Sequence, residues 1–352
     1  LVLNERRDFA AVQERRASRD WPELSAGLRR HADRLGRLAA SGELSLFIGA
    51  GASRPAGLPD WWGLLDGLAN EAKTKRPSRL KDPFEAAEPI AKKLGDGLQI
   101  AVRRQLKRDK HGVGHGLMAS IPVKRMVTTN FDRCMELALK ATAGKDFRVL
   151  TRQLAIGTSP WLLKLNGDIG QRKSVVLTSS DLHSHPDERQ ALEGVVQSLL
   201  LTGHLLFVGF SLTDTNFLIL AQAVSKIRAR ADGATRGKPG TAIALTDGDC
   251  ERARYGDLNM LSMSPQAAGE GARLLEIFLD RLVWKASRQG DLASEYLLDD
   301  RYATGLKKRD RELREMLISL RDNVSANMRS TKGWKRVAQC LQDLGDDSHY
   351  RG

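Results

Sequence analysis

Short apolar runs that end in glycine or in small polar residues recur along the middle of the chain. Runs this short and this apolar are typical of strands that are buried on both faces of a parallel sheet. Their tips carry residues that favour turns, such as Gly, Asn, Asp and Ser. The predicted strands are LSLFIG (44–49), VKRMVTTNFD (123–132), LLKLNGD (162–168), SVVLTSSDL (174–182), HLLFVGFS (204–211) and GTAIALTDGD (240–249).

Helical spacing fills the segments between these strands. Residues 23–42 place leucines three or four positions apart on one face, and Gly42 can end that helix. Residues 62–120 are predicted to be mostly helical, with prolines that punctuate them. Strands that alternate with helices predict an α/β fold, in which a doubly wound parallel sheet has helices on both faces.

Three parts are expected along the chain, whose 352 residues suit roughly two domains. Residues 1–43 form a helical N-terminal extension. Residues 44–284 form the α/β domain, with a helical insertion over about 62–120. Residues 285–352 are charged, lack any strand-like run and form a basic helical C-terminal tail.

Composition indicates an ordinary soluble protein, with 41% hydrophobic and 28% charged residues. No apolar run approaches the roughly 18 residues that a membrane helix needs, and the charged N-terminus has no signal-peptide apolar region. Cys134, Cys250 and Cys340 form no CxxC pair, which argues against a cysteine zinc site and favours a reduced, cytoplasmic location.

The formal net charge of +13 favours contact with polyanions. Two interpretations of the basic clusters stay open: solvated helix faces, and contact with nucleic acid or an acidic partner. The clusters contain no interleaved aromatic residues, which weakens the case for stacking on bases. They are Arg6, Arg7, Arg15, Arg16 and Arg19; Arg103, Arg104, Lys107, Arg108 and Lys110; and Lys307, Lys308, Arg309, Arg311 and Arg314.

The turn after the first predicted strand, within FIGAGASRPAGLPDWW (47–62), is suited to an anion. Gly49 and Gly51 let the backbone approach a ligand, and Ser53 is expected to begin a helix whose N-terminal amides face it. Arg54 stands where the dinucleotide fingerprint has its third glycine, and no Gly-Lys-Ser/Thr forms a P-loop. Because ligands bind beyond the carboxyl ends of parallel strands, the polar turns are expected to converge on one cleft.

Four motifs, in this order, resemble the signature of the sirtuin superfamily. They are GAGAS with GLPDWW (49–62), TTNFD (128–132), KLNGD (164–168) and VGFSLTD (208–214). TTNFD, SLTDTNF and the helical segment after the first motif look like the SIR2-like NAD-hydrolysing domains of bacterial anti-phage defence proteins, of the SIR2–HerA or SIR2–Argonaute type. The resemblance implies a Rossmann-like sheet of the SIR2 type that takes NAD as its substrate.

The resemblance implies which portion of NAD each turn binds. The first turn is expected to carry the pyrophosphate, the 208–214 turn the adenosine side, and Asp60 the nicotinamide carboxamide. Asp132 is expected to anchor its turn rather than react. Asp214 and Asn216 are suited to capping the next helix as well as to contacting the ligand. The expected NAD-binding residues are Gly49, Ala50, Gly51, Ser53, Asp60, Trp61, Thr129, Asp132, Gly209, Ser211, Asp214 and Asn216.

Asn130 and Asn166 are the expected catalytic residues. Nicotinamide leaves as a neutral molecule, so the reaction needs a stabilised oxocarbenium-like ribose and a positioned water. The family has a histidine where this chain has Asn166, and an amide has no useful basicity near neutral pH. Three explanations stay open: a substitution introduced to trap NAD, an enzyme that positions water with two amides, and a degenerate NAD-sensing or scaffolding domain.

Other histidines are assigned no chemistry. His115, in the helical segment before IPVKRM, is expected to pack or to lie at the surface rather than to replace the missing base. The pair His183-x-His185 is expected to lie in a polar surface loop, and no metal site is predicted.

The leading functional prediction is an NAD+ hydrolase of the bacterial cytoplasm that forms ADP-ribose and nicotinamide and acts in anti-phage defence by NAD depletion. The alternative is an inert NAD-binding or assembly subunit of a defence complex. A protein deacylase is disfavoured, because the chain lacks the two CxxC pairs of a zinc ribbon. The expected partners are further copies of the chain and a regulatory HerA-type ATPase or Argonaute-like protein. The basic segments are candidates for nucleic-acid contact, and no membrane contact is expected.

Overall fold

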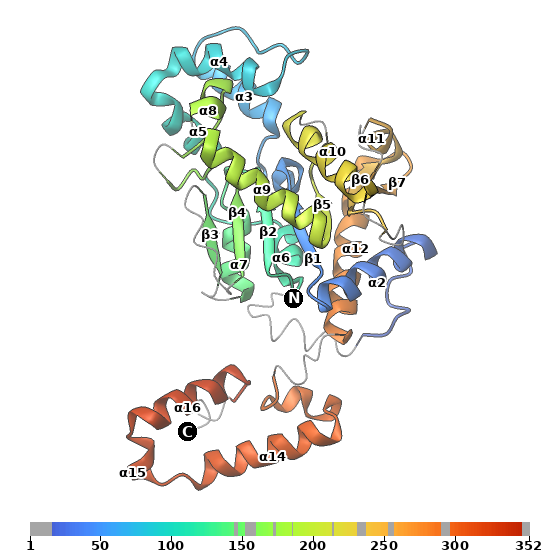
Figure 1. The fold of residues 1–352 in the computed structure, drawn as a ribbon, viewed down its shortest axis with the longest axis vertical. Helices are drawn as coiled ribbons and strands as arrows, with labels where there is room; N and C mark the ends of the chain where they lie inside the picture. Colours follow the sequence, from blue (N-terminus) through green and yellow to red (C-terminus); the bar gives the residue numbers. More distant parts are fainter. Residues whose placement is uncertain are drawn as a thin grey trace. The chain divides into compact units, whose positions relative to one another are not determined.

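Seven parallel strands form one sheet, in the order β3-β4-β2-β1-β5-β6-β7 (Figure 1). The computed structural model describes residues 16–143, 147–151, 160–171, 174–184, 186–212, 215–230, 237–252, 257–289 and 296–346. The strands are β1 (Leu44–Ile48), β2 (Arg125–Thr128), β3 (Arg148–Leu150), β4 (Trp161–Lys164), β5 (His204–Val208), β6 (Gly240–Thr246) and β7 (Asn259–Ser264).

Helices connect the strands and continue beyond the sheet. Those before β5 are α2 (Ala26–Ala40), α3 (Trp61–Glu71), α4 (Pro83–Leu94), α5 (Leu98–Leu106), α6 (Val113–Ser120), α7 (Cys134–Ala143), α8 (Ser179–Ser184) and α9 (Pro186–Thr202). Those after β5 are α10 (Thr215–Arg230), α11 (Asp247–Arg252), α12 (Ala268–Gln289), α14 (Lys308–Asn323), α15 (Ala326–Arg329) and α16 (Lys332–Asp343). Short 3-10 helices are η1 (Ala50–Ala56), η2 (Gly95–Gly97) and η3 (Asp300–Gly305).

The strand order is doubly wound, as predicted. After β1 the chain builds β2, β3 and β4 on one side of it, and then β5, β6 and β7 on the other. The direction of building therefore reverses at β1, between β2 and β5. In open parallel sheets such a reversal leaves a crevice beyond the carboxyl ends of the strands, which is where ligands bind.

Apolar side chains cover both faces of the sheet. On one face Phe47 of β1 lies 5.2 Å from Phe207 of β5 and 5.5 Å from Phe217 of α10, between ring centroids. Helix α9 adds apolar side chains to the same core. Leu46 precedes Phe47 in the strand, so it points to the opposite face, and it is equally buried. Burial on both faces explains why the strands are almost continuously apolar.

Two compact units make up the chain. One unit spans Arg19–Ala286 and contains both the sheet and α2. The other contains the helices that follow Ser287. In that second unit, charged side chains pair: Arg314 with Asp300 at 2.6 Å and Arg321 with Asp346 at 2.7 Å. The predicted three-part division, with boundaries after residues 43 and 284, stays a prediction, and residues 1–15 lie outside the described part.

In the part of the chain that the structure describes, no helix combines the length and the apolar character that crossing a membrane requires.

One predicted strand is wrong. Residues 174–178 form no strand, and α8 begins at Ser179. Thr178 and Asp181 explain the start of the helix, since the Asp181 carboxylate accepts from Thr178 N at 2.9 Å and Thr178 Oγ1 accepts from Asp181 N at 3.0 Å. This reciprocal capping box fixes a helix N-terminus. The apolar side chains that suggested a strand, Val175 and Leu177, are buried among the helices of the insertion instead.

Two strands were missed. β3 has only three residues, and its first, Arg148, is exposed. β7 mixes polar and apolar residues in NMLSMS rather than forming an apolar run. Both lie at the edges of the sheet, where partial exposure removes the continuous apolar signal.

The turns after β1 and β5 touch through their backbones. A Cβ atom on Gly49 would lie 2.4 Å from Gly209 O, and one on Gly209 would lie 2.2 Å from Ala52 N. Gly209 also has a φ of +67°, a conformation that L side chains rarely adopt. Only glycine fits at both positions, so the two turns are held at a separation that no side chain allows.

We therefore expect Gly209→Ala to lower the free energy of unfolding by at least about 2 kcal/mol, from the positive φ and the backbone overlap together. The matched control is Gly194→Ala in α9, where an added Cβ meets nothing within 4 Å. It should be neutral or raise stability by up to about 1 kcal/mol. Urea unfolding monitored by tryptophan fluorescence measures both. Equal stability of the two variants would contradict the close contact.

Candidate functional site

The turns at the carboxyl ends of the central strands are joined by hydrogen bonds. Gly51 N donates to Gly209 O at 2.9 Å, which links the turn after β1 to the turn after β5. Thr128 Oγ1 donates to Ile48 O at 2.9 Å, and Leu165 N donates to Thr128 O at 2.9 Å. The four motif turns thus meet at one edge of the sheet, at the point where the strand order reverses.

Ser53 lies at the centre of a buried hydrogen-bond network. It is inside η1 rather than at the start of an α-helix, which corrects the sequence prediction. Its Oγ donates to Asp132 Oδ2 at 2.9 Å, lies 3.2 Å from His115 Nε2 and accepts from Asn130 Nδ2 at 3.2 Å. All of the hydroxyl's hydrogen-bonding capacity is used inside the protein. Ser53 can therefore affect a bound dinucleotide only through the residues that it holds.

Asn130 has an acceptor without a partner. Its Nδ2 donates to Gly49 O at 3.1 Å and to Ser53 Oγ, so both amide hydrogens are used. Its Oδ1 is buried and accepts no hydrogen bond from the described residues. A buried acceptor in this state costs about 1–3 kcal/mol unless a donor reaches it. A water or a ribose hydroxyl supplies such a donor, and this atom therefore fits a ligand with hydroxyl groups.

Asp132 anchors the TTNFD turn. Its Oδ1 accepts from Cys134 N at 2.9 Å, at the start of α7, and its Oδ2 accepts from Ser53. Both oxygens are therefore engaged with the chain. This geometry agrees with the expectation that Asp132 holds the turn in place.

His115 is buried, with 1% of its surface exposed. Of the two positions expected from the sequence, packed or at the surface, it has the packed one. Its Nδ1 accepts from Gly112 N at 3.3 Å. Burial lowers the pKa of His115 below its ordinary 6.5, against an opposing effect of the Asp132 carboxylate and with a smaller lowering by His111. The ring is therefore neutral at physiological pH.

His115, Asp132 and Cys134 have ligand-type atoms within 4.8 Å of one another, which is the spacing of a metal site. Burial, with the nearby Asp132 carboxylate, raises the pKa of the Cys134 thiol to about 12. A thiol must lose its proton to bind a metal, and both Asp132 oxygens already accept hydrogen bonds. The donor set fits a structural hydrogen-bond network better than a cation site.

Lys164 ties the TTNFD turn to the KLNGD turn. The side chain is completely buried, and its Nζ donates to Asp132 O at 2.6 Å and to Glu136 Oε1 at 2.7 Å. Asp168 Oδ1 lies 3.6 Å away. Burial raises the pKa of Glu136, and the Lys164 ammonium opposes that shift. A buried cation with such partners holds two loops in a fixed register.

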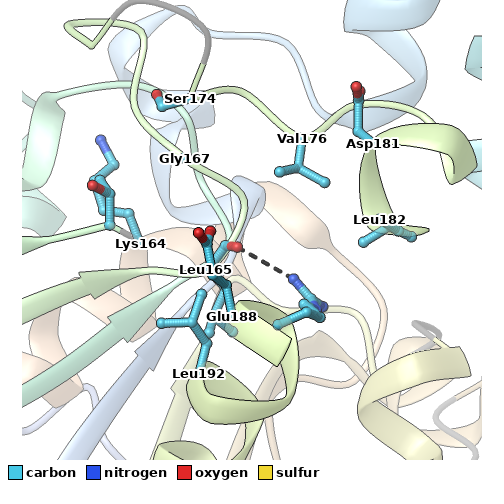
Figure 2. A pocket seen from close by; sticks show the side chains of 11 residues that line it. Lys164, Leu165, Gly167, Ser174, Val176, Asp181, Leu182, Glu188 and Leu192 are labelled. Carbon is cyan, nitrogen blue, oxygen red and sulfur yellow. Dashed lines mark hydrogen bonds between the residues drawn. The ribbon is translucent and has the colours of Figure 1, made fainter. Parts of the chain in front are cut away.

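Asn166 is held at both ends of its amide. Its Oδ1 accepts from Arg189 Nη1 at 3.1 Å, and its Nδ2 donates to Thr129 O at 3.4 Å. Arg189 also donates to Leu165 O at 3.2 Å, a bond drawn in Figure 2 beside a small pocket between the end of β4 and helices α8 and α9. Asn166 is 2% exposed, so it is part of the turn's internal packing.

The remaining predicted residues lie in different surroundings. Asp60 caps α3, accepting from Gly63 N at 2.8 Å, and keeps its side chain 48% exposed. Trp61 packs on Phe131, and its Nε1 is a second buried polar atom without a partner among the described residues. Ser211 is exposed at the 208–212 turn.

Asp214 lies outside the described residues, and so does the side chain of Asn216 in the first turn of α10. Ala50 and Gly51 lie in η1, which places them in the turn after β1. The assignment of all these residues to NAD binding stays a prediction.

Two residues of the site were missed by sequence reasoning. His115 precedes β2 by ten positions, and only the packing of α6 on η1 and α7 brings it to Ser53. Arg189 lies on α9, 23 residues from Asn166. The signal that the sequence carries for His115 is a single histidine in the apolar segment of α6. The sequence carries no signal for Arg189.

Part of the chain is similar to known proteins. Residues 124–255 match the family model of the SIR2-like domain. NAD(+) hydrolase ThsA of Enterococcus faecium is 29% identical over 199 residues, which are 53% of this chain and 40% of that protein. Defense-associated sirtuin 2 of Bacillus subtilis is 24% identical over 201 residues, which are 53% of this chain and 20% of that protein.

A chain from the solved structure "Structural Basis for the Mechanism and Regulation of Sir2 Enzymes" aligns with a TM-score of 0.40 at 14% identity, over 72% of this chain and 98% of that one. The matches span 40% or less of the two curated relatives. The segment matched by the family model includes the turns at 128–132 and 164–168 and the end of β5, whereas the glycine turn at 49–53 precedes it.

Because Lys164 is enclosed with two carboxylates, Lys164→Met should lower the free energy of unfolding by about 3–5 kcal/mol, the usual cost of leaving buried charges without their partner. Lys140→Met, an exposed lysine of α7, is the matched control and should stay within about 0.5 kcal/mol of the parent chain. Urea unfolding midpoints measure both. A loss below about 1 kcal/mol for Lys164→Met would show that the cation does not hold the two turns together.

Proposed function

We propose that this chain, which carries a SIR2-like domain, hydrolyses NAD to ADP-ribose and nicotinamide. The observation that carries the proposal is the Asn130 amide at the reversal point of the sheet. It lies against the glycine turn, both of its hydrogens are committed, and its buried oxygen lacks a partner among the described residues. That oxygen is suited to accept from the nicotinamide ribose or from the attacking water.

The reaction asks little of acid–base groups. The bond between ribose C1′ and the nicotinamide nitrogen breaks, and its electron pair stays on nicotinamide, which leaves neutral. The oxygen of a water then bonds to C1′, and the proton that it releases passes to solvent. Holding the ribose and that water in place is the main task of the protein, and a fixed amide can perform it.

Asn166 belongs to the scaffold of this site in our proposal. Its amide oxygen accepts from Arg189 and its nitrogen donates to Thr129 O, so neither end depends on a ligand. A histidine at this position would stand beside the Arg189 guanidinium, which lowers the pKa of a neighbouring imidazole and so weakens it as a base. This interpretation favours an enzyme that works with amides over one disabled at position 166.

Relatives support the biological setting. Proteins with the names NAD(+) hydrolase ThsA and Defense-associated sirtuin 2 match about half of this chain. We therefore propose a role in anti-phage defence through depletion of NAD. Self-assembly, and control by a HerA-type ATPase or Argonaute-like partner, stay predictions.

An inert NAD-binding subunit is the second candidate, and one observation favours it: an amide stands where the family has its histidine. The two candidates differ in turnover and not in binding. Nicotinamide release from NAD and the dissociation constant for NAD therefore have to be measured on the same preparations.

We expect the chain to release nicotinamide from NAD and Asn130→Ala to lower kcat by at least about 100-fold, the usual cost of removing one preorganised polar group from the reacting centre. Asn70→Ala, an exposed asparagine in α3, is the matched control and should keep the parent rate. Chromatographic detection of nicotinamide and ADP-ribose gives the rates. Binding of NAD without release by the parent chain would favour the inert subunit.

Asn166→His tests the role of the second amide. If Asn166 is scaffold, the histidine variant should turn over NAD no faster than the parent chain, because it loses the hydrogen bonds to Arg189 and Thr129. Activity that is present only in Asn166→His would mark Asn166 as a disabling residue instead.

A further inference from the structure

His115 is connected to Asn130 through a single side chain. The imidazole lies on α6, and its Nε2 is 3.2 Å from Ser53 Oγ. The same Ser53 oxygen accepts from Asn130 Nδ2 at 3.2 Å. Two hydrogen bonds therefore join a buried ring to the amide that the proposed reaction depends on.

The hydrogen positions along this connection follow from the partners. Gly112 N donates to His115 Nδ1, so the proton of the neutral ring is on Nε2, which donates to Ser53. Ser53 donates its own hydrogen to Asp132 Oδ2. Its two lone pairs accept from His115 and Asn130. The partners therefore fix the position of each hydrogen in the network. Exchanging the oxygen and nitrogen of the Asn130 amide would place two acceptor oxygens, Asn130 Oδ1 and Gly49 O, against each other.

We propose that His115 is a positioning residue, whose neutral imidazole acts through Ser53 to hold the Asn130 amide in the orientation that NAD turnover requires. The kinetic consequence rests on the proposed function. The link between the imidazole and the amide does not, because it is a property of the chain without any ligand.

Protonation of His115 would break this arrangement. A second ring proton on Nδ1 would face Gly112 N–H, which now donates to that atom. The titratable groups around the ring are Asp132 in the turn after β2, the Cys134 thiol at the start of α7 and His111 before α6. Since burial lowers the pKa of His115 below 6.5, the ring is neutral at pH 7.5 and gains a proton only in acid. Turnover should therefore fall as the pH drops below 6.5.

The first experiment reads the amide directly, without activity. The chain is labelled with 15N-asparagine, and the Asn130 side-chain NH2 signals are identified as those that Asn130→Ala removes. They should shift with pH in the parent chain, with a midpoint below 6.5, and the transition should be absent from His115→Gln. Ser53→Ala, which removes the connecting hydroxyl and keeps the ring, should abolish the same transition.

His111→Gln is the matched control. His111 is next to the network, but its ring bonds to Gly112 O and not to Ser53. The pH transition of the Asn130 signals should therefore persist in this variant. Its activity should remain that of the parent chain.

The second experiment follows kcat against pH. His115→Gln keeps a neutral donor at this site, so at pH 7.5 its kcat should stay within about 10-fold of the parent and the acid fall should disappear. His115→Leu has no donor and should lose about 10- to 100-fold in kcat, with KM within about 3-fold. A residue that only stabilises the fold would lower the unfolding temperature without changing the shape of the pH profile.

The outcomes separate the two proposals. Asn130 signals that do not move with pH, or that move equally in His115→Gln, overturn the positioning role. Pronounced acid loss of kcat that persists in His115→Gln overturns it as well. If no preparation releases nicotinamide, the proposed function fails, and the spectroscopic experiment still decides whether His115 orients Asn130.

Discussion

The site depends on a contact between two backbones. The turns after β1 and β5 approach so closely that a Cβ on Gly49 would lie 2.4 Å from the carbonyl oxygen of Gly209. This contact joins the two turns at the point where the strand order reverses, and it leaves main-chain atoms where no side chain would fit. Anionic ligands favour such surfaces, because peptide N–H groups approach them without steric hindrance.

Two buried networks set the polar side chains against that edge. In one, Ser53 joins His115, Asp132 and Asn130, and each partner uses a distinct hydrogen or lone pair. In the other, the Lys164 ammonium joins the TTNFD and KLNGD turns through Glu136 and the main chain. Charges and amides at such depth are stable only when their partners are complete. Three buried polar atoms of the described residues lack a partner, Trp61 Nε1, Glu136 Oε2 and Asn130 Oδ1, and the last belongs to the amide that is bonded to the glycine turn.

The central strands and their turns could be predicted from the sequence, because strands buried on both faces are nearly continuous in apolar residues and end abruptly. The edge strands β3 and β7 escaped prediction, since β3 has only three residues and β7 interrupts its apolar residues with polar ones. Residues 174–178 caused the opposite error, a predicted strand that the structure does not contain. Val175 and Leu177 are as buried as strand residues, and apolar character alone does not distinguish a strand from a buried loop before a helix.

The turns that carry the predicted site residues could be located from the sequence, because motif spacing is local. His115 and Arg189 could not, because they reach the turns only through tertiary packing of α6 and α9. Tertiary packing also explains why α3 is capped by Asp60, whereas the sequence predicted a helix that begins at Ser53. Ser53 faces inward to the network, whereas the Asp60 carboxylate is available to cap α3.

A crystal structure of this chain with ADP-ribose, the product of the proposed reaction, tests the convergence of the turns most directly. We expect the pyrophosphate to lie against the backbone of residues 49–51 and 209–211, and the terminal ribose to lie within hydrogen-bond distance of Asn130 Oδ1. A nucleotide bound at another edge of the sheet, or an Asn130 amide that stays clear of it, would contradict the account.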